Sequence, residues 1–250
     1  MNCNEQASWR KGSTMIDIHC HILYGVDDGS PDQETSRRML DRMAQSGVTA
    51  VIATPHFRHN MFPYPQDKIE EAYDILREYA SSKHISLYPG CEYHVCHDIF
   101  EHLETGRVHT LADTGYILTE YSYSDSLDRI LNYSQELIMR GWKPVIAHIE
   151  RCEVFQRKPA LAQDVLDSGT MIQVNANAVL GLDGRAAKKT ARKLLDLDLV
   201  DFIASDAHDL DERVSHMEEC FAFVRKKYGD AAASFLFEEN QAGILTDSRL

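Results

Sequence analysis

The sequence predicts an α/β fold built around a parallel sheet, and two observations support this prediction. From Met15 onward, short apolar runs alternate with longer segments of helical periodicity, and no Pro/Gly/Ser-rich linker or low-complexity segment separates them. The short runs are mostly apolar throughout, which is typical of strands that helices cover on both faces. With 250 residues, of which 44% are hydrophobic, the chain suffices for one large domain. The pattern leaves open whether the sheet closes into a (β/α) barrel or stays open and doubly wound.

Seven short runs are the predicted strands. Each is five to seven residues long and rich in apolar side chains, and a longer helical pattern or an irregular segment follows it. The predicted strands span 15–19, 48–54, 85–90, 116–121, 144–149, 171–175 and 200–206.

The segment after the first strand carries the clearest helix signals. Ser30 and Gln33 match a capping box, Pro31 takes the first helical position, and Gly47 follows the last turn. Apolar residues at helical spacing predict the later helices. The predicted helices span 31–46, 66–82, 125–140, 159–168, 184–197 and 211–228, and the connection 92–115 is less regular.

Composition and charge exclude several functional classes. Lys and Arg total 26 against 39 Asp and Glu, and the formal net charge of -13 argues against a general electrostatic affinity for nucleic acid or anionic lipid. An anionic substrate therefore needs a local source of positive charge. No apolar run approaches the ~18 residues of a membrane span, so membrane insertion is not expected.

Cysteine spacing and the N-terminal composition predict a cytoplasmic protein. The six cysteines stand at irregular spacings, and residues 1–14 lack the apolar stretch of a signal peptide. Residues 1–14 are polar and without pattern, so we expect a flexible extension before a single domain at 15–250. Cys91 and Cys96 form a C-x4-C pair with no second pair, which argues against a zinc site there.

Ionisable side chains stand at the ends of six of the seven predicted strands, or in the turns that follow them. In a (β/α) barrel those ends meet at one mouth, where active sites are built. His19 and His21 are two residues apart on one strand, so their side chains leave the same face while Cys20 points away. The candidates for this mouth are His19, His21, Asp27 or Asp28, His56, Glu92, Glu120, His148, Asp206 and His208.

The alternative is that these residues are structural. A single histidine near a strand end is more often hydrogen-bonded structure than a ligand. That alternative would have to explain why five histidines and three or four carboxylates all stand at the C-terminal ends of six strands, so we favour a shared site. His59 and His94 are candidates for the rim of the mouth, and the remaining histidines are interpreted as surface residues.

The mixture of imidazole and carboxylate without thiolate suits manganese, iron or zinc. About nine ligands are too many for a single ion, so two or three ions are expected. Such clusters clamp phosphoryl or carbonyl oxygens and lower the pKa of a shared water, which predicts metal-assisted hydrolysis. Arg151 and Arg213 follow two of the strand ends and are the candidate catalytic residues, because a guanidinium pairs well with phosphate oxygens.

Seven short motifs, in order along the chain, resemble the polymerase and histidinol phosphatase (PHP) superfamily. More narrowly, they resemble the manganese-dependent protein-tyrosine phosphatases encoded with bacterial capsule and exopolysaccharide genes. The similarity extends from about Met15 to Ile244, and the segments "VIAHIERC", "QVNAN" and "VDFIASDAHDLDER" favour this phosphatase branch. The motifs are "DIHCH", "DDG", "ATPH", "CE", "TE", "AHIER" and "SDAH".

The resemblance implies a distorted (β/α)7 TIM-like barrel, the PHP fold, as a single domain with a trinuclear Mn²⁺ site. It assigns one ion to His19, His21, Glu92 and Asp206. It assigns a second ion to Glu92, Glu120 and His148, and a third to Asp28, His56 and His208. Iron or zinc remain alternatives to manganese, and Asp27 remains an alternative to Asp28.

The activity that the resemblance implies is hydrolysis of protein phosphotyrosine. The implied substrate is an autophosphorylating bacterial tyrosine kinase of polysaccharide assembly. We expect in-line attack by metal-bound hydroxide, with Arg151 and Arg213 holding the phosphoryl oxygens. The oligomeric state stays open between a monomer and a homo-oligomer.

Three other functions compete with this interpretation. A phosphatase for histidinol phosphate or another small metabolite would use the same chemistry, and so would a nuclease-like phosphoesterase, which the net charge disfavours. A barrel that binds metal or a partner without catalysis is the third. A cysteine-dependent tyrosine phosphatase needs a C-x5-R motif, and no cysteine here has an arginine six residues later.

Overall fold

The computed structural model describes residues 14–247, and its nine strands all run parallel. The predicted flexible extension, apart from Thr14, lies outside the described residues. One sheet has the order β1 (Met15–Cys20), β2 (Val48–Ala53), β4 (Ser86–Pro89). The other has the order β3 (His56–Phe57), β5 (Glu92–His94), β6 (Tyr116–Glu120), β7 (Lys143–Ile146), β8 (Met171–Asn175), β9 (Phe202–Ala204).

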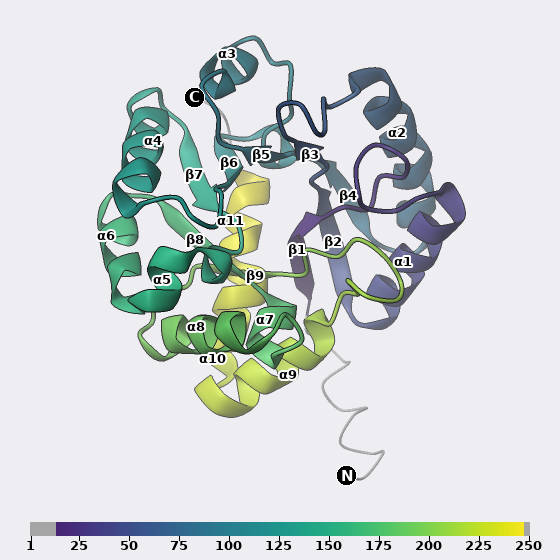
Figure 1. Cartoon of the computed structure of the whole chain (residues 1–250). Coiled ribbons are helices and arrows are strands. Elements are labelled where there is room, and N and C mark those ends of the chain that lie inside the picture. The colour runs from purple at the N-terminus through teal and green to yellow at the C-terminus, as the bar shows by residue number, and fades with distance from the viewer. Residues whose placement is uncertain (1–13, 248–250) are drawn as a thin grey trace.

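The two sheets belong to a single barrel wall, because two of its strands are each interrupted for only two residues. β3 continues the path of β2, and β5 continues the path of β4, each after a two-residue interruption. β9 returns to β1 through a bridge between Ala207 and Cys20 and a hydrogen bond from the Asp206 amide to the His19 carbonyl, 2.8 Å long. The wall therefore has seven strand positions, and the predicted (β/α)7 barrel is confirmed (Figure 1).

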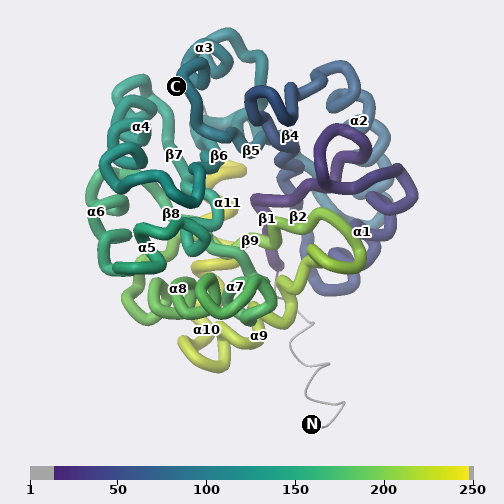
Figure 2. The backbone as a smooth tube through the Cα atoms, viewed as in Figure 1, coloured from purple at the N-terminus to yellow at the C-terminus, as the bar shows by residue number. Residues whose placement is uncertain are grey.

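Helices surround this wall in an outer ring, as Figures 1 and 2 show. Nine of these helices follow the strand positions in the expected βα alternation and bury apolar side chains against the sheet. They are α1 (Gln33–Gln45), α2 (Gln66–Ser82), α3 (Ile99–Glu104), α4 (Leu127–Met139), α5 (Glu153–Arg157), α6 (Ala162–Asp167), α7 (Ala176–Leu180), α8 (Arg185–Asp196) and α9 (Met217–Tyr228).

The C-terminal helices were not predicted, and they close the barrel from below. α10 (Asp230–Ser234), the π-helical turn η4 (Phe235–Glu239) and α11 (Asn240–Thr246) form one continuous helical path. α11 crosses behind the strands in the centre of Figure 1. Its Ile244 is fully buried in the inner core with Ile16, Ile18 and other strand residues. The interior below the mouth is therefore packed and apolar.

Several details differ from the prediction. α5 and α7 were not predicted, and the strand predicted at 200–206 spans only Phe202–Ala204. Ser30 and Gln33 do not form a capping box; Asp32 caps α1 and accepts a hydrogen bond from the Thr35 amide at 2.8 Å. The strand predicted at 144–149 ends at Ile146, because His148 adopts a left-handed conformation and the 3-10 turn η2 (Ile149–Arg151) follows. The helix predicted at 211–228 begins only at Met217.

An irregularity in β1 directs its histidines into the mouth. The pairing of β1 with β2 shifts register between Asp17 and Cys20. Below the shift, Ile16 and Ile18 face the inner core, whereas above it His19 and His21 face the mouth and Cys20 joins the outer core. Such a bulge re-aims side chains without ending the strand.

Candidate metal centre

All nine predicted ligand residues meet at the mouth formed by the C-terminal ends of the strands. His19 and His21 come from β1 and the residue after it, His56 and Glu92 begin β3 and β5, and Glu120 ends β6. Asp28, His148, Asp206 and His208 come from the loops after β1, β7 and β9. Eight of the nine residues are buried, and Asp28 is the exposed one.

The deepest group consists of His19, His21, Glu92 and Asp206. The Nε2 atoms of His19 and His21 are 3.3 Å apart. Oε2 of Glu92 lies 3.2 Å from Nε2 of His19 and 3.1 Å from Nε2 of His21. Four ligand atoms thus face one point, and this group is identical with the first predicted ligand set.

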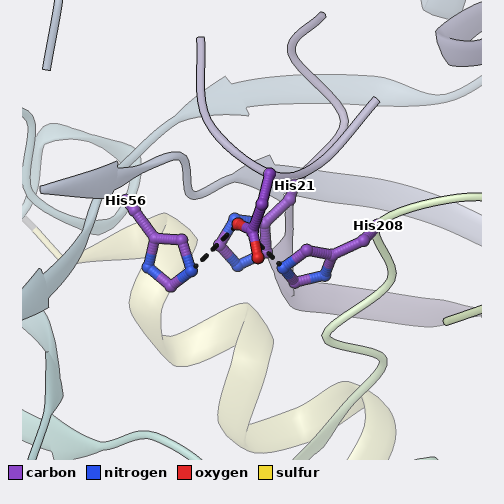
Figure 3. Close-up of side chains that lie close together, drawn as sticks. His21, His56 and His208 are labelled. Atoms are coloured by element: carbon purple, nitrogen blue, oxygen red, sulfur yellow. Dashed lines mark ion pairs between the residues drawn. The ribbon is translucent and has the colours of Figure 1, made fainter. Parts of the chain in front are cut away.

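A second group lies nearer the solvent and contains His21, Asp28, His56 and His208. Oδ1 of Asp28 is 3.4 Å from Nε2 of His56 and 3.6 Å from Nε2 of His208. Figure 3 shows the rings of His21, His56 and His208 gathered around this point. The structure therefore brings the predicted set of Asp28, His56 and His208 together and adds His21 to it.

The third group contains His56, Glu92 and Glu120. The resemblance had placed His148 rather than His56 with these two carboxylates. Nε2 of His148 lies 2.7 Å from Glu92 and 3.9 Å from Glu120, so this set is also close together. Glu92 takes part in two of the three groups and stands between them.

Hydrogen bonds behind the histidines fix which ring nitrogen faces the centre. Nδ1 of His21 bonds to Oδ2 of Asp27 at 2.8 Å, and Nδ1 of His19 bonds to Oε1 of Gln173 at 3.2 Å. Nδ1 of His208 donates to the backbone carbonyl of Asp206 at 2.9 Å. Each bond leaves Nε2 as the ring nitrogen directed into the mouth, as ligating histidines require.

These contacts separate the roles of Asp27 and Asp28. Oδ2 of Asp27 also accepts from the His56 amide at 2.9 Å, and its Oδ1 accepts from the Gly29 amide at 2.9 Å. Both of its oxygens are thus occupied outside the groups. Gly29 belongs to the same turn, where a Cβ atom would lie 2.4 Å from the His21 carbonyl oxygen, so only glycine fits. Asp28, in contrast, directs Oδ1 toward His56 and His208.

Gln173 and Asn175 on β8 were not predicted as site residues, because their side chains are amides and the expected metal ligands were imidazoles and carboxylates. Oε1 of Gln173 accepts from the His148 amide at 2.8 Å, and its Nε2 donates to Oδ1 of Asn175 at 2.8 Å. Nδ2 of Asn175 in turn donates to Oδ2 of Asp206 at 2.8 Å. The sequence signal that could have identified them is their position at the end of a predicted strand.

Burial and neighbouring charges set the protonation of the cluster. Burial lowers the pKa of His148 to about 4, with Arg151 acting in the same direction, and burial with the nearby His21 lowers that of His208 to about 4. Both imidazoles are therefore neutral at pH 7, the form that binds metal. Burial opposes ionisation of Glu92, but His19 and His56 outweigh it and hold its pKa well below the usual range.

Several buried atoms of the cluster have no hydrogen-bond partner. They are Oε2 of Glu92, Oε2 of Glu120, Nδ1 of His56 and Nε2 of His208. Leaving such atoms unpaired is costly unless another group binds them. Imidazole nitrogens and carboxylate oxygens without thiolate are the donors that divalent manganese, iron or zinc take, so the residues fit a bound metal.

A family model described as "Capsular polysaccharide synthesis, CpsB/CapC" matches residues 15–246. The chain belongs to this family. It is 35% identical over 240 residues to the tyrosine-protein phosphatase CpsB of Streptococcus pneumoniae, covering 93% of this chain and 99% of that protein. It is 31% identical over 230 residues to the tyrosine-protein phosphatase YwqE of Bacillus subtilis, covering 90% and 89%.

Solved structures agree with this CpsB/CapC assignment. One described as "YwqE from Bacillus subtilis and CpsB from Streptococcus pneumoniae, unique metal-dependent tyrosine phosphatases" matches with a TM-score of 0.87 at 29% identity, covering 94% of this chain and 96% of that one. An organophosphorus hydrolase from Deinococcus radiodurans, at 12% identity, matches with a TM-score of 0.59 over 94% and 93%, which shows the fold alone. The predicted family is confirmed.

Two arginines of this CpsB/CapC member lie over the metal groups, where the sequence had placed them. Nη2 of Arg151 is 2.8 Å from Oδ2 of Asp206. Nη1 of Arg213 is 3.2 Å from Oδ2 of Asp28, and its Nη2 is 3.3 Å from Asp206. Both guanidiniums therefore lie at the mouth, where they pair with the carboxylates of Asp206 and Asp28.

Exposed apolar side chains form part of the rim, which the sequence had not indicated. Met61 is 58% exposed in the turn after β3, and Tyr123 is 51% exposed three residues after Glu120. Leu182 is 59% exposed beside Asp183, whose carboxylate lies 3.8 Å from Arg151. We call Met61, Tyr123 and Leu182 the apolar rim.

The other candidates from the sequence lie outside the three groups. His59 is 3.6 Å from Asp98, and Nε2 of His94 is 3.2 Å from the Ser122 hydroxyl. No thiolate belongs to a metal group within residues 14–247. Cys91 is buried, and Sγ of Cys96 donates to Asp98 at 2.6 Å. None of the helices in the described part of the chain is both long and apolar enough to cross a membrane.

Proposed function

We propose that this chain is a metal-dependent tyrosine-protein phosphatase that hydrolyses phosphotyrosine in a protein substrate. The observation that carries the proposal is the convergence of five histidines and four carboxylates at one mouth, with two arginines above them. Membership of the CpsB/CapC family and the names of its relatives support the same activity.

We propose three divalent ions, with manganese as the native metal and iron or zinc as alternatives. His19, His21, Glu92 and Asp206 would hold the first ion. Glu92, Glu120 and His148 would hold the second, with His56 close enough to contribute. Asp28, His56 and His208 would hold the third. The buried atoms of Glu92, Glu120, His56 and His208 that make no hydrogen bond support this assignment.

Bound divalent ions supply a water of lowered pKa and neutralise phosphoryl charge. The chain's own residues orient the substrate. Arg151 and Arg213 each present a planar donor fork at the mouth, suited to the oxygens of a phosphate dianion. In the structure these forks bind Asp206 and Asp28, which keeps them in place above the groups. The leaving phenolate, with a reference pKa of ~10, needs less protonation than an alkoxide.

The apolar rim supports an aromatic substrate over a small polar metabolite such as histidinol phosphate. Tyr123 and Leu182 expose apolar surface near Arg151, and Met61 exposes apolar surface in the loop after β3, so a phenyl ring would meet apolar side chains once its phosphate reached the mouth. Aromatic contacts of this kind contribute about 0.5–1.5 kcal/mol beyond the area they bury.

For the substrate we propose a bacterial autophosphorylating tyrosine kinase of capsule or exopolysaccharide assembly. The family description and the names of the relatives support this context. We also propose that the protein acts in the cytoplasm, and the five free cysteines within residues 14–247 suit a reducing compartment. A nucleic-acid substrate is disfavoured by the net charge of -13.

The decisive experiment compares initial rates on a phosphotyrosine peptide and on histidinol phosphate, with added Mn²⁺. We expect much faster turnover of the peptide, and His148→Ala should abolish turnover while the circular dichroism spectrum stays that of a folded barrel. Faster turnover of histidinol phosphate would replace the proposal by the metabolite alternative. Full activity of His148→Ala would remove His148 from the centre.

A further inference from the structure

A groove on the outer ring carries positive charge that the metal centre does not use. It lies between α5 and α8, has a volume of about 460 Å³, and is lined by Gln156, Arg157, Pro159, Lys189, Thr190, Arg192, Lys193 and Asp196. The segment 185–193 on α8 contains five cationic residues and no acid. This density contrasts with the net charge of -13 for the whole chain.

Two lysines of this groove form no ion pair within residues 14–247. Lys189 and Lys193 stand one helical turn apart on α8 and both are exposed, and the acid that the charge of Lys193 acts on is Asp196. The acids nearby are already paired: Asp196 with Lys227 at 2.8 Å, and Glu153 with Arg157. The lysine charges therefore remain available to a ligand.

The groove is physically joined to the metal centre. Nε2 of Gln156 donates to the backbone carbonyl oxygens of Glu150 at 3.0 Å and Arg151 at 3.4 Å. α8 begins at Arg185, two residues after Asp183, which pairs with Arg151. Figure 1 shows α5 and α8 side by side next to the mouth, and α8 also packs against the turn that carries Arg151. A polypeptide leaving the mouth on this side would pass the start of α8, beside Asp183 and Arg151, and then follow the helix to Lys189 and Lys193.

We propose that the groove binds an acidic segment of the phosphotyrosine protein, next to the residue that is dephosphorylated. This inference rests on the proposed function, because it names the chemistry of that substrate. The 12 residues of α8 span roughly 18 Å, at about 1.5 Å per residue. An extended segment of about five or six residues covers the same length, at about 3.3 Å per residue. Aspartate or glutamate side chains of this segment would pair with Lys189 and Lys193.

A polynucleotide suits the groove less well than a peptide. The positive charge is confined to one helix and its neighbour, and the rest of an acidic molecule would repel a long polyanion. A short acidic peptide avoids this repulsion, since its charge extends no further than the groove.

The test measures binding and does not require turnover. A fluorescein-labelled peptide with five consecutive glutamates is titrated with the full chain in low salt, next to the same peptide with glutamines. We expect the glutamate peptide to bind about tenfold more tightly, as two exposed ion pairs allow, and high salt should remove the difference. The double variant Lys189→Glu/Lys193→Glu should lose the tenfold preference.

A matched control makes the same change of charge elsewhere. Arg38→Glu/Lys68→Glu alters exposed cations of α1 and α2, far from the groove in Figure 1, and should keep the preference within about twofold. Lys189→Gln/Lys193→Gln repeats the test without reversing charge, should the first variant fold poorly. Equal loss in control and groove variants would overturn the proposal, as would equal binding of both peptides. A single-stranded oligonucleotide that binds through Lys189 and Lys193 while the peptide does not would also overturn it.

Turnover separates this inference from the proposed function. p-Nitrophenyl phosphate is too small to reach the groove, so the groove variant should hydrolyse it at the wild-type rate. On a phosphotyrosine peptide with an acidic flank, the variant should show a KM raised about tenfold with kcat unchanged. If the wild-type protein binds the glutamate peptide selectively but hydrolyses no aryl phosphate, the proposed function fails and the groove assignment stands.

Discussion

Asp27 accepts a hydrogen bond from Nδ1 of His21 at 2.8 Å and so turns Nε2 of that ring toward Glu92. The same carboxylate oxygen accepts the backbone amide of His56 at 2.9 Å. One buried side chain thereby links the loop after β1 to the start of β3. Burial opposes its ionisation, but the charge and the hydrogen bond of His21 outweigh this, so the pKa of Asp27 lies below its usual value.

Asp27→Ala is expected to weaken metal binding by about tenfold to a hundredfold, because the tautomer and orientation of His21 would no longer be fixed. The amides of His56 and Gly29 would also lose their acceptor. The measurement is the metal dissociation constant by isothermal titration calorimetry, together with kcat at saturating Mn²⁺.

Asp32→Ala provides the matched control, because Asp32 also accepts a backbone amide in the same loop but faces solvent as the cap of α1. It should cost about 0.5–2 kcal/mol of stability and leave metal affinity unchanged. Unchanged metal affinity in Asp27→Ala would show that His21 does not depend on this bond.

Chelation is expected to abolish activity, whereas thiol alkylation should not. All catalytic groups in the proposed centre are imidazoles, carboxylates and guanidiniums. The cysteines make poor nucleophiles: burial, reinforced by Glu150, raises the pKa of Cys152 to about 12, and burial with Asp98 raises that of Cys96 to about 11. The measurement is the rate on p-nitrophenyl phosphate after excess chelator, after iodoacetamide, and after restoring Mn²⁺. Activity that survives the chelator would contradict the metal assignment.

The sequence was sufficient to predict the seven strand positions and the residues that meet at the mouth. Those predictions depend on local signals, namely apolar runs, turn residues and the polar side chains that follow each strand. His19 and His21 could be placed on one face because strand geometry has a fixed period of two. The interruptions that separate β3 from β2 and β5 from β4 did not move His56 and Glu92 away from the mouth.

The rest depends on contacts between residues far apart in the chain. Nothing local reveals that Gln173 bonds both His19 and the amide of His148, or that Asp27 bonds two loops. The register shift in β1 is a property of its pairing with β2, not of its own residues. The position of α11 depends on the apolar interior that side chains of several strands form together, into which its Ile244 packs.

Tyr123→Ala is expected to lower kcat/KM on phosphotyrosine peptides by about twofold to tenfold, because an aromatic contact of about 0.5–1.5 kcal/mol would be lost. Tyr123→Phe should keep most of the activity, since the ring remains. Rates on glycerol phosphate, which has no ring, should be equal in all three proteins. An equal fall on both substrates would mean that Tyr123 supports the loop, whose carbonyl binds the Glu153 amide, rather than the substrate.

Arg151→Lys is expected to lower kcat on aryl phosphates by about tenfold to a hundredfold, with a much smaller change in KM. Lysine keeps the positive charge but loses the planar fork that holds two phosphoryl oxygens as charge develops on them. Asp206 would keep Arg213 as a partner at 3.3 Å, so the folded centre should persist. Arg157→Lys, on the exposed face of α5, is the control and should leave kcat unchanged. Calorimetry of Mn²⁺ binding then decides the role of Arg151. Intact affinity with reduced kcat places its guanidinium on the substrate, whereas a parallel loss of affinity would mean that its main task is to position Asp206.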